Sequence, residues 1–243
     1  MVDGTNSTYF KHAAICAKFY ELAFDSKAVA NFLLQKLSIK PNDKVLFVGG
    51  MFAVANELSK HNIDLTVVDY SQDMVNFAKA KYLDMKVSTA DLMTLPFNNT
   101  SDKVIVPGRV FTHLLTDGDI HSGLTSCLNS LKPGGVCFFD NYESDKISVT
   151  DYFNGFLTFE DSESKIARTS TTVLISSNPY IVNWKARYQG EFLGEKFDFE
   201  DNILHRAWSR KEALQFTEAA GFGSVLQEDN FDETSFCSVA VKH

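Results

Sequence analysis

One short unit constrains the fold of this chain more than any other part of its sequence. The apolar run at residues 45–48 ends in Gly49-Gly50, and a second apolar run at 65–68 ends in Asp69. Short continuous apolar runs are typical of strands buried on both faces of a parallel sheet. Asp69 lies 20 residues after Gly49, which matches the spacing of about 20 between a glycine turn and an acid that binds ribose hydroxyls. The unit therefore predicts a crevice for a nucleotide-like cofactor.

Helices and strands alternate on both sides of this unit. Two helices are expected between about residues 9 and 37, with Asp25 or Ser26 capping the second. Further helices are expected at 54–61, 71–82, 117–131 and 209–220, and further strands at 85–90, 103–106, 136–140, 224–227 and 236–241. The segment at 132–135, Lys-Pro-Gly-Gly, is expected to be a turn. This alternation predicts an α/β fold with a doubly wound, mostly parallel sheet.

The pattern changes between residues 144 and 207, where polar and apolar residues alternate as in half-buried strands. Tyr180, Trp184 and Tyr188 fall on one face of such a strand. Asn178-Pro179 supplies a turn, so residues 171–175 should pair with this strand as a hairpin. We therefore expect an α/β core formed by residues 1–143 and 208–243, with an N-terminal helical lid, and an antiparallel β insertion at 144–207 that covers the pocket.

Charge and composition limit the classes of partner. The 243 residues carry a net charge of −8 without any run of Lys or Arg, which argues against nucleic acid and anionic membranes. No apolar run approaches the ~18 residues that span a bilayer, and the N-terminus lacks the pattern of a signal peptide. Four scattered cysteines show no metal-ligand spacing and should be buried, reduced thiols. We expect a cytoplasmic protein that acts on a small molecule without a metal, and a homodimer is left open.

Five blocks of sequence, in this order, resemble the class I S-adenosylmethionine-dependent methyltransferases. They are VLFVGG, VVDYSQDMVNFAKA, STADLMTLPF, LNSLKPGGVCFFD and HRAWSRKEALQFTEAAGF, and the resemblance spans roughly residues 10–243. It points to the branch that acts on small molecules and carries an antiparallel insertion before the last helix. The resemblance implies a Rossmann-like, seven-stranded sheet, with its antiparallel strand supplied by the C-terminal pair. It also implies methyl transfer from S-adenosylmethionine, with S-adenosylhomocysteine as product and no metal.

The resemblance also assigns residues to the cofactor. Asp69 would bind both ribose hydroxyls, and glycine in the loop would let the backbone approach the ligand closely. Asp91 would contact the adenine amino group, although an acid at this position could equally cap a helix. The cofactor-binding set is Gly49, Gly50, Asp69, Tyr70, Asp91 and Leu92.

The glycine loop departs from the family pattern. Phe47 replaces the usual acid, and Met51 and Ala53 replace two later glycines. The departure affects the predicted grip on the amino-acid end of the cofactor and leaves the adenosine end intact. The side chain of Met51 or Phe52 could fill the vacated space or could turn away into the packing of the helix.

Methyl transfer asks little covalent chemistry of the protein, because the sulfonium is already activated and the protein mainly aligns the acceptor. His113, which follows the fourth strand, is the candidate catalytic base, and a surface or capping histidine is the alternative. His205 and Arg206 could hold an anionic group of the substrate or could be charges at a strand end. The substrate-binding set is Tyr20, Asn141, Tyr142, Tyr188, His205 and Arg206.

Functions from different classes stay open at this point. The leading hypothesis is an enzyme that moves a methyl group from S-adenosylmethionine to a nitrogen or oxygen of a small molecule. The alternative is a protein of this fold that has lost methyl transfer and acts as a ligand-binding protein or as a catalyst of cyclisation or rearrangement. A nicotinamide-dependent dehydrogenase is disfavoured, because its glycine fingerprint also fails and the LKPGG block has no role there.

Overall fold

The apolar runs on either side of the glycine turn form neighbouring parallel strands. In the computed structural model, which describes residues 7–148 and 155–243, β1 (Lys44–Val48) pairs with β2 (Asp64–Asp69) on one side. On its other side β1 pairs with β4 (Ser101–Val106). Every residue of β1 after Lys44 is buried, as expected for a strand that is covered on both faces.

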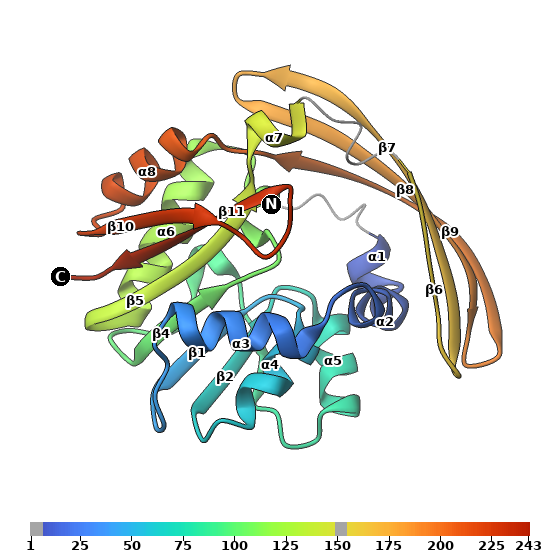
Figure 1. Cartoon of the computed structure of the whole chain (residues 1–243), viewed down its shortest axis with the longest axis horizontal. Coiled ribbons are helices and arrows are strands. Elements are labelled where there is room, and N and C mark those ends of the chain that lie inside the picture. The colour runs from blue at the N-terminus through green and yellow to red at the C-terminus, as the bar shows by residue number, and fades with distance from the viewer. Residues whose placement is uncertain (1–6, 149–154) are drawn as a thin grey trace.

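These strands form the centre of a seven-stranded sheet with the order β10-β11-β5-β4-β1-β2-β3 (Figure 1). Its other members are β3 (Val87–Thr89), β5 (Leu131–Tyr142), β10 (Val225–Asp229) and β11 (Ser235–Val241). Strand β11 runs antiparallel to both of its neighbours. The predicted doubly wound sheet is confirmed, as is the antiparallel strand from the C-terminal pair.

Helices cover both faces of this sheet, because alternate residues of each strand point to opposite faces. Phe47 packs with α3 (Ser26–Lys36), α4 (Phe52–Ser59) and α5 (Gln72–Lys81). Leu46 packs on the other face with α6 (Asp117–Ser130) and α8 (Arg210–Ala219). The apolar runs of the sequence are therefore the two-sided core of the sheet.

Side chains cap the starts of α3 and α5. The Asp25 carboxylate accepts a hydrogen bond from the Ala28 amide at 2.9 Å, so Asp25 rather than Ser26 caps α3. The Ser71 hydroxyl accepts one from the Met74 amide at 3.3 Å at the start of α5. The latter cap fixes the point at which the chain turns from β2 into its helix.

The Pro133-Gly134-Gly135 segment differs from the prediction of a simple turn. Strand β5 begins at Leu131, directly after α6, and the segment forms an irregularity within the strand. Ser101 pairs with Leu131, whereas Lys103 pairs with Val136. The strand bulges here because Gly134 adopts a φ of +75°, which glycine reaches at no steric cost.

A second, four-stranded antiparallel sheet curves away from the core (Figure 1). It contains β6 (Gly155–Glu160), β7 (Ser164–Ser177), β8 (Tyr180–Phe192) and β9 (Glu195–Arg206). The predicted hairpin is confirmed, since β7 pairs with β8 across the turn at 178–179. One face of the sheet packs against Phe19 of α2 (Ala13–Ala23), which follows α1 (Ser7–Phe10).

The division into a core and an insertion at 144–207 stays a prediction of domain organisation. Residues 1–6 of the predicted lid and 149–154 of the predicted insertion lie outside the described residues. The short helix α7 (Ser144–Ser148) connects β5 to this region. All four cysteines are free and buried, as predicted. Across 7–148 and 155–243, no helix has the length and apolar character needed to cross a membrane.

Candidate functional site

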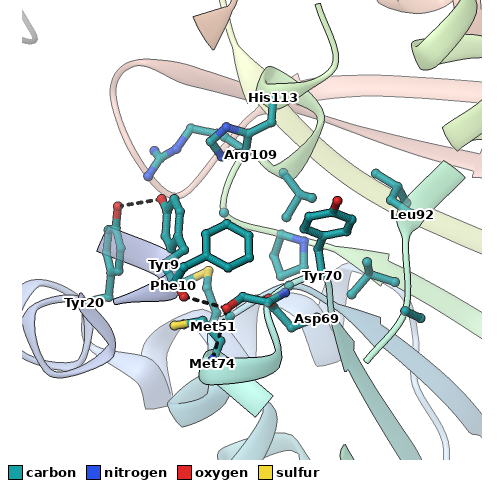
Figure 2. Close-up of a pocket in the computed structure, with 18 of the residues that line it drawn as sticks. Tyr9, Phe10, Tyr20, Met51, Asp69, Tyr70, Met74, Leu92, Arg109 and His113 are labelled. Carbon is teal, nitrogen blue, oxygen red and sulfur yellow. Dashed lines mark hydrogen bonds between the residues drawn. The ribbon is translucent and has the colours of Figure 1, made fainter. Parts of the chain in front are cut away.

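The carboxyl ends of β1, β2 and β4 open into a cavity, which we call the strand-end cavity (Figure 2). Gly49 follows β1, Asp69 ends β2, and Arg109 follows β4, and all three line this cavity. Tyr9 and Tyr20, from α1 and α2, form the opposite wall. Open α/β sheets bind their ligands in the crevice outside the carboxyl ends of the strands, so the fold places this cavity where a ligand site is expected.

Asp69 presents a carboxylate to the strand-end cavity. One of its oxygens accepts a hydrogen bond from the Ser71 amide at 2.8 Å, and among the described residues Asp69 has no ion-pair partner. Burial raises the pKa of Asp69 to about 6, although the hydrogen bond from Ser71 acts in the opposite direction. A half-buried carboxylate that lacks a cation is suited to accept hydrogen bonds from a ligand.

The two glycines next to Asp69 are required by the geometry of the loop. Gly49 has a φ of +113°, and a Cβ on this residue would lie 2.7 Å from Cγ2 of Val110. A Cβ on Gly50 would lie 2.6 Å from Cε of Met74 and 3.4 Å from the Asp69 carboxylate. Side chains at these positions would therefore collide with the floor of the cavity or narrow it.

Met51 and Phe52, whose side chains could each fill the space left by the missing glycines, point in different directions. Met51 lines the strand-end cavity, and its sulfur lies 3.0 Å from the place where a Cβ on Gly108 would be. Phe52 turns away from the cavity and is buried in the core with α3 and α5. Met51 thus fills part of the space that the family pattern leaves to glycine.

The predicted cofactor-binding residues do not all reach the cavity. Tyr70 and Leu92 line it, and Tyr70 makes an edge-to-face contact with Phe10, with ring centroids 6.2 Å apart. Asp91 lies outside the lining residues and accepts a hydrogen bond from the Met93 amide at 2.9 Å. This bond caps the short 3₁₀ turn Leu92–Thr94, so the structure shows the capping role for Asp91, and its contact with adenine stays a prediction.

A second cavity, which we call the insertion cavity, adjoins the first and has a volume of about 460 Å³. It lies between α2, the end of β5 and the four-stranded sheet, and Tyr142, Arg168, Trp184 and His205 are among the residues that line it. Its volume falls within the ~300–1,000 Å³ range of small-molecule sites. The residues that line both cavities define their junction: Tyr9, Tyr20, Phe24, Gly108, Arg109 and His113.

His113, the candidate base, lies at this junction. It ends the 3₁₀ turn Val110–His113 that follows β4, and its ring centroid is 5.9 Å from that of Tyr9 and 5.3 Å from that of His205. Burial lowers the pKa of His113 to about 4. Burial also lowers the pKa of His205, and the nearby His113 and Arg109 add to that shift. Both imidazoles are therefore neutral near pH 7.

Of the predicted substrate residues, Tyr20, Tyr142 and His205 line the insertion cavity, whereas the other three lie outside its wall. Asn141 is buried and donates a hydrogen bond to the Arg206 carbonyl at 3.3 Å. The guanidinium of Arg206 pairs with Asp117 at 2.7 Å.

Tyr188 is likewise buried, and it packs against Phe19 in the core of the second sheet. The structure thus gives Asn141, Tyr188 and Arg206 partners within the protein instead of positions in the cavity wall.

Arg109 lines both cavities but was not among the predicted site residues. Its backbone is left-handed, with a φ of +62°. The buried Asp140 carboxylate accepts hydrogen bonds from the amides of Arg109 at 2.7 Å and Gly108 at 3.3 Å. The guanidinium donates to Asp232 at 2.8 Å and lies 5.0 Å from the ring centroid of Tyr142. The Pro107-Gly108 pair after β4 indicates a turn at this point of the sequence. It does not indicate which residues bind Arg109.

Arg168 of β7 is a second residue that the sequence did not single out. Its guanidinium carbon lies 4.8 Å from the ring centroid of Phe19 and 5.3 Å from that of Trp184. These rings come from α2 and β8, so the contact depends on pairing between distant segments. Within the described ranges, no group of three or more His, Cys, Asp or Glu is arranged to hold a metal ion.

Comparisons with known proteins agree on one family of folds. A family model described as a methyltransferase domain matches residues 49–135. A search of curated proteins found no match. Among solved structures, an S-adenosylmethionine-dependent methyltransferase from Clostridium acetobutylicum is similar, with a TM-score of 0.75 at 16% identity, covering 96% of this chain and 98% of that one.

Two further structures extend the likeness. DesVI from Streptomyces venezuelae has a TM-score of 0.83 at 18% identity, covering 96% of this chain and 98% of its own. CalS10 from Micromonospora echinaspora, an amino pentose methyltransferase solved with bound S-adenosylmethionine, has a TM-score of 0.74 at 16% identity, covering 96% of each chain. The resemblance noted in the sequence and the Rossmann-like fold class are confirmed.

Proposed function

Because residues 49–135 match a methyltransferase domain and the whole chain has the fold of S-adenosylmethionine-dependent methyltransferases, we propose that this protein transfers a methyl group from S-adenosylmethionine to an amino nitrogen of a sugar-like molecule. The observation that carries the proposal is the junction of the two cavities. The strand-end cavity has the features of a nucleoside site, and the insertion cavity meets it at His113.

The residues of the strand-end cavity fit the cofactor. Asp69 offers a carboxylate without a cation for the ribose hydroxyls, and Tyr70 and Leu92 offer apolar surface for the adenine ring. Gly49 and Gly50 keep the adjoining loop free of side chains. When bound, S-adenosylmethionine supplies a methyl group activated on a sulfonium.

His113 can orient an acceptor at the junction without adding a positive charge of its own next to the sulfonium. His113 is neutral near pH 7 because burial lowers its pKa to about 4, so its ring can accept a hydrogen bond from an acceptor N–H. Such a bond would direct the nitrogen lone pair toward the strand-end cavity. We assign His113 the role of orienting the acceptor amine. Its low pKa makes it too weak a base to hold the proton of the methylated ammonium, so that proton leaves with the product.

The insertion cavity supports a sugar as acceptor. Its wall combines the aromatic rings of Phe19 and Trp184 with the hydroxyls of Ser170, Tyr142 and Thr234. Aromatic surface can cover the C–H face of a sugar, and hydroxyl groups can bind its polar edge. The similar protein CalS10 is an amino pentose methyltransferase, which favours an amino sugar over a plain hydroxylated one.

Two measurements test this proposal. Calorimetry with S-adenosylmethionine and S-adenosylhomocysteine should detect binding of both, and neither binding at millimolar concentration would contradict the proposal. The protein should then be incubated with S-adenosylmethionine and matched pairs of sugars that differ only in an amino or hydroxyl group. We expect mass spectrometry to show methylation of amino members. Cofactor binding without methylation of any acceptor would instead favour the ligand-binding alternative.

A further inference from the structure

We propose that Arg109, rather than the glycine loop, holds the carboxylate at the amino-acid end of S-adenosylmethionine. This inference rests on the proposed function, because it takes the strand-end cavity as the cofactor site. Arg109 would then compensate for the loss of the family's glycine pattern in the loop.

The side chains of the loop offer no charge to an amino-acid group. Phe47, which stands where the family carries an acid, is fully buried in the core and faces α3, α4 and α5. Met51 brings a thioether into the cavity, and its sulfur packs toward Gly108. Neither side chain can pair with a charged carboxylate.

The lining of the strand-end cavity contains one permanently charged cation. Among the described residues that line it, Arg109 is the only Arg or Lys. One of its nitrogens, Nη1, donates to Asp232. Its other two nitrogens, Nη2 and Nε, make no hydrogen bond within the described part of the chain. A guanidinium binds carboxylates through two parallel hydrogen bonds, so Arg109 retains free donors for a ligand.

The position of Arg109 corresponds to the amino-acid end of the cofactor. Figure 2 shows Leu92 and Arg109 toward opposite ends of the cavity, with Asp69 and Tyr70 between them. If Asp69 binds the ribose and Leu92 the adenine, the remainder of the ligand extends past Met51 toward Arg109. Arg109 also lines the insertion cavity, so it stands beside the point where acceptor and methyl group meet.

Arg109 is fixed in place before any ligand binds. Asp140 accepts hydrogen bonds from two successive backbone amides of its loop, and Asn230 donates to the same carboxylate at 2.7 Å. Asp232, which anchors the guanidinium, accepts further hydrogen bonds from Thr234 and Ser235. A cation held in this way loses little side-chain entropy on binding, which favours its use as an anchor.

The test compares two ligands that differ at the amino-acid end. S-adenosylhomocysteine carries the amino-acid group, whereas 5′-methylthioadenosine has the same adenosine and thioether without it. We expect Arg109→Gln to weaken S-adenosylhomocysteine by about tenfold or more, since a charge-assisted pair is lost. Binding of 5′-methylthioadenosine should change by less than about twofold. Calorimetry measures both dissociation constants, and Arg109→Lys should give an intermediate loss for the first ligand only.

Two further variants separate binding from folding. Arg109→Gln leaves the half-buried Asp232 without its cation, so the double variant Arg109→Gln/Asp232→Asn removes both charges together. It should reproduce the ligand selectivity of the single variant. Arg187→Gln is the matched control, because Arg187 pairs with Asp198 on the exposed part of the second sheet. Thermal unfolding of each variant checks that it is folded at the temperature of the measurement.

The outcomes are distinguishable. Equal loss of both ligands would overturn the inference and show that Arg109 only supports the loop, and no change in either would also overturn it. If the unaltered protein binds S-adenosylhomocysteine while the Arg109 variants keep the same ratio of affinities, the proposed function stands and this inference fails. If the unaltered protein binds neither ligand, both fail.

Discussion

The strand-end cavity and the insertion cavity share one junction but are built by different means. The first takes its floor from turns at the ends of three adjacent strands, where Gly49, Asp69 and Gly108 lie. The second is assembled from side chains on α2, β5 and the four-stranded sheet. A site made by strand ends follows from the core of the fold, whereas a site made by distant segments can change without disturbing that core. The difference predicts that the two cavities will respond separately to substitution.

The variant His113→Phe should show the largest difference between its effect on catalysis and its effect on cofactor binding. This change keeps a ring at the junction but removes the hydrogen-bond acceptor, so we expect kcat to fall by about 10²-fold or more. The dissociation constant of S-adenosylhomocysteine should stay within about twofold, because the cofactor keeps its contacts with Asp69. Single-turnover kinetics measures the rate of methyl transfer, and calorimetry measures the dissociation constant of S-adenosylhomocysteine. A loss confined to cofactor affinity would place His113 with the strand-end cavity alone.

Substitutions of two acids, Asp69 and Asp91, test the strand-end cavity itself. Asp69→Ala should weaken S-adenosylhomocysteine by about 10- to 100-fold, since the ribose hydroxyls lose a charged acceptor. Asp91→Ala should weaken it by no more than about threefold, because Asp91 caps a 3₁₀ turn and does not line the cavity. Calorimetry at one pH gives both values. Comparable losses would mean that Asp91 reaches the adenine after all.

The pH should affect binding and stability in opposite directions through Asp69. Burial raises the pKa of Asp69 from 3.8 to about 6, and the ionised form is the better acceptor for ribose hydroxyls. S-adenosylhomocysteine affinity should therefore fall about tenfold between pH 7 and pH 5. The contribution of Asp69 to stability is present below its unfolded pKa and is lost as the pH rises through about 6. In Asp69→Asn, the affinity measured by calorimetry should no longer depend on pH in this range. If the pH dependence is unchanged, a group other than Asp69 causes it.

The smallest effect should be confined to the insertion cavity. Trp184 contacts both His205 and Arg168 through its ring, so Trp184→Phe should raise the KM of the acceptor by roughly 2- to 10-fold through weaker stacking. The affinity for S-adenosylhomocysteine should not change. Steady-state kinetics with the acceptor, together with calorimetry, checks this, and a parallel loss of cofactor binding would show that the cavities are coupled.

Local sequence was enough to predict the strand-end cavity, because its parts follow one another along the chain. A buried strand, a glycine turn and an acid at the next strand end led directly to Gly49 and Asp69. Ser71, a residue type typical of helix N-caps, likewise caps its helix. The bulge at Pro133-Gly134-Gly135 was not predicted, since its form depends on pairing with β4.

Three of the six predicted substrate residues line the insertion cavity, and strand geometry explains part of this division. His205 and Arg206 are neighbours on β9, and neighbouring residues of a strand point to opposite faces. His205 therefore lines the cavity, while Arg206 pairs with Asp117. On β5, Tyr142 lines the cavity, whereas its neighbour Asn141 bonds to the Arg206 carbonyl. The alternation of side chains along a strand could therefore have indicated that only one residue of each pair lines the cavity.

Arg109 could not have been found in this way. It is held by Asp140 and Asp232, which lie 31 and 123 residues away along the chain. No local pattern connects these residues, and only the completed sheet brings them to the same place. Tyr188 likewise packs against Phe19 from a distant segment, which no local pattern indicates.

The place of β11 in the sheet has a consequence for how the protein is made. This strand follows α8 and β10 in the sequence, yet it lies between β5 and β10. A nascent chain that still lacks residues 230–241 has Asp69 and both glycines, but β5 has an unpaired edge and Arg109 has no Asp232. During synthesis the half of the proposed cofactor site around Asp69 can therefore form well before the half around Arg109. Ligand binding can stabilise the full site only after residues 225–241 have left the ribosome.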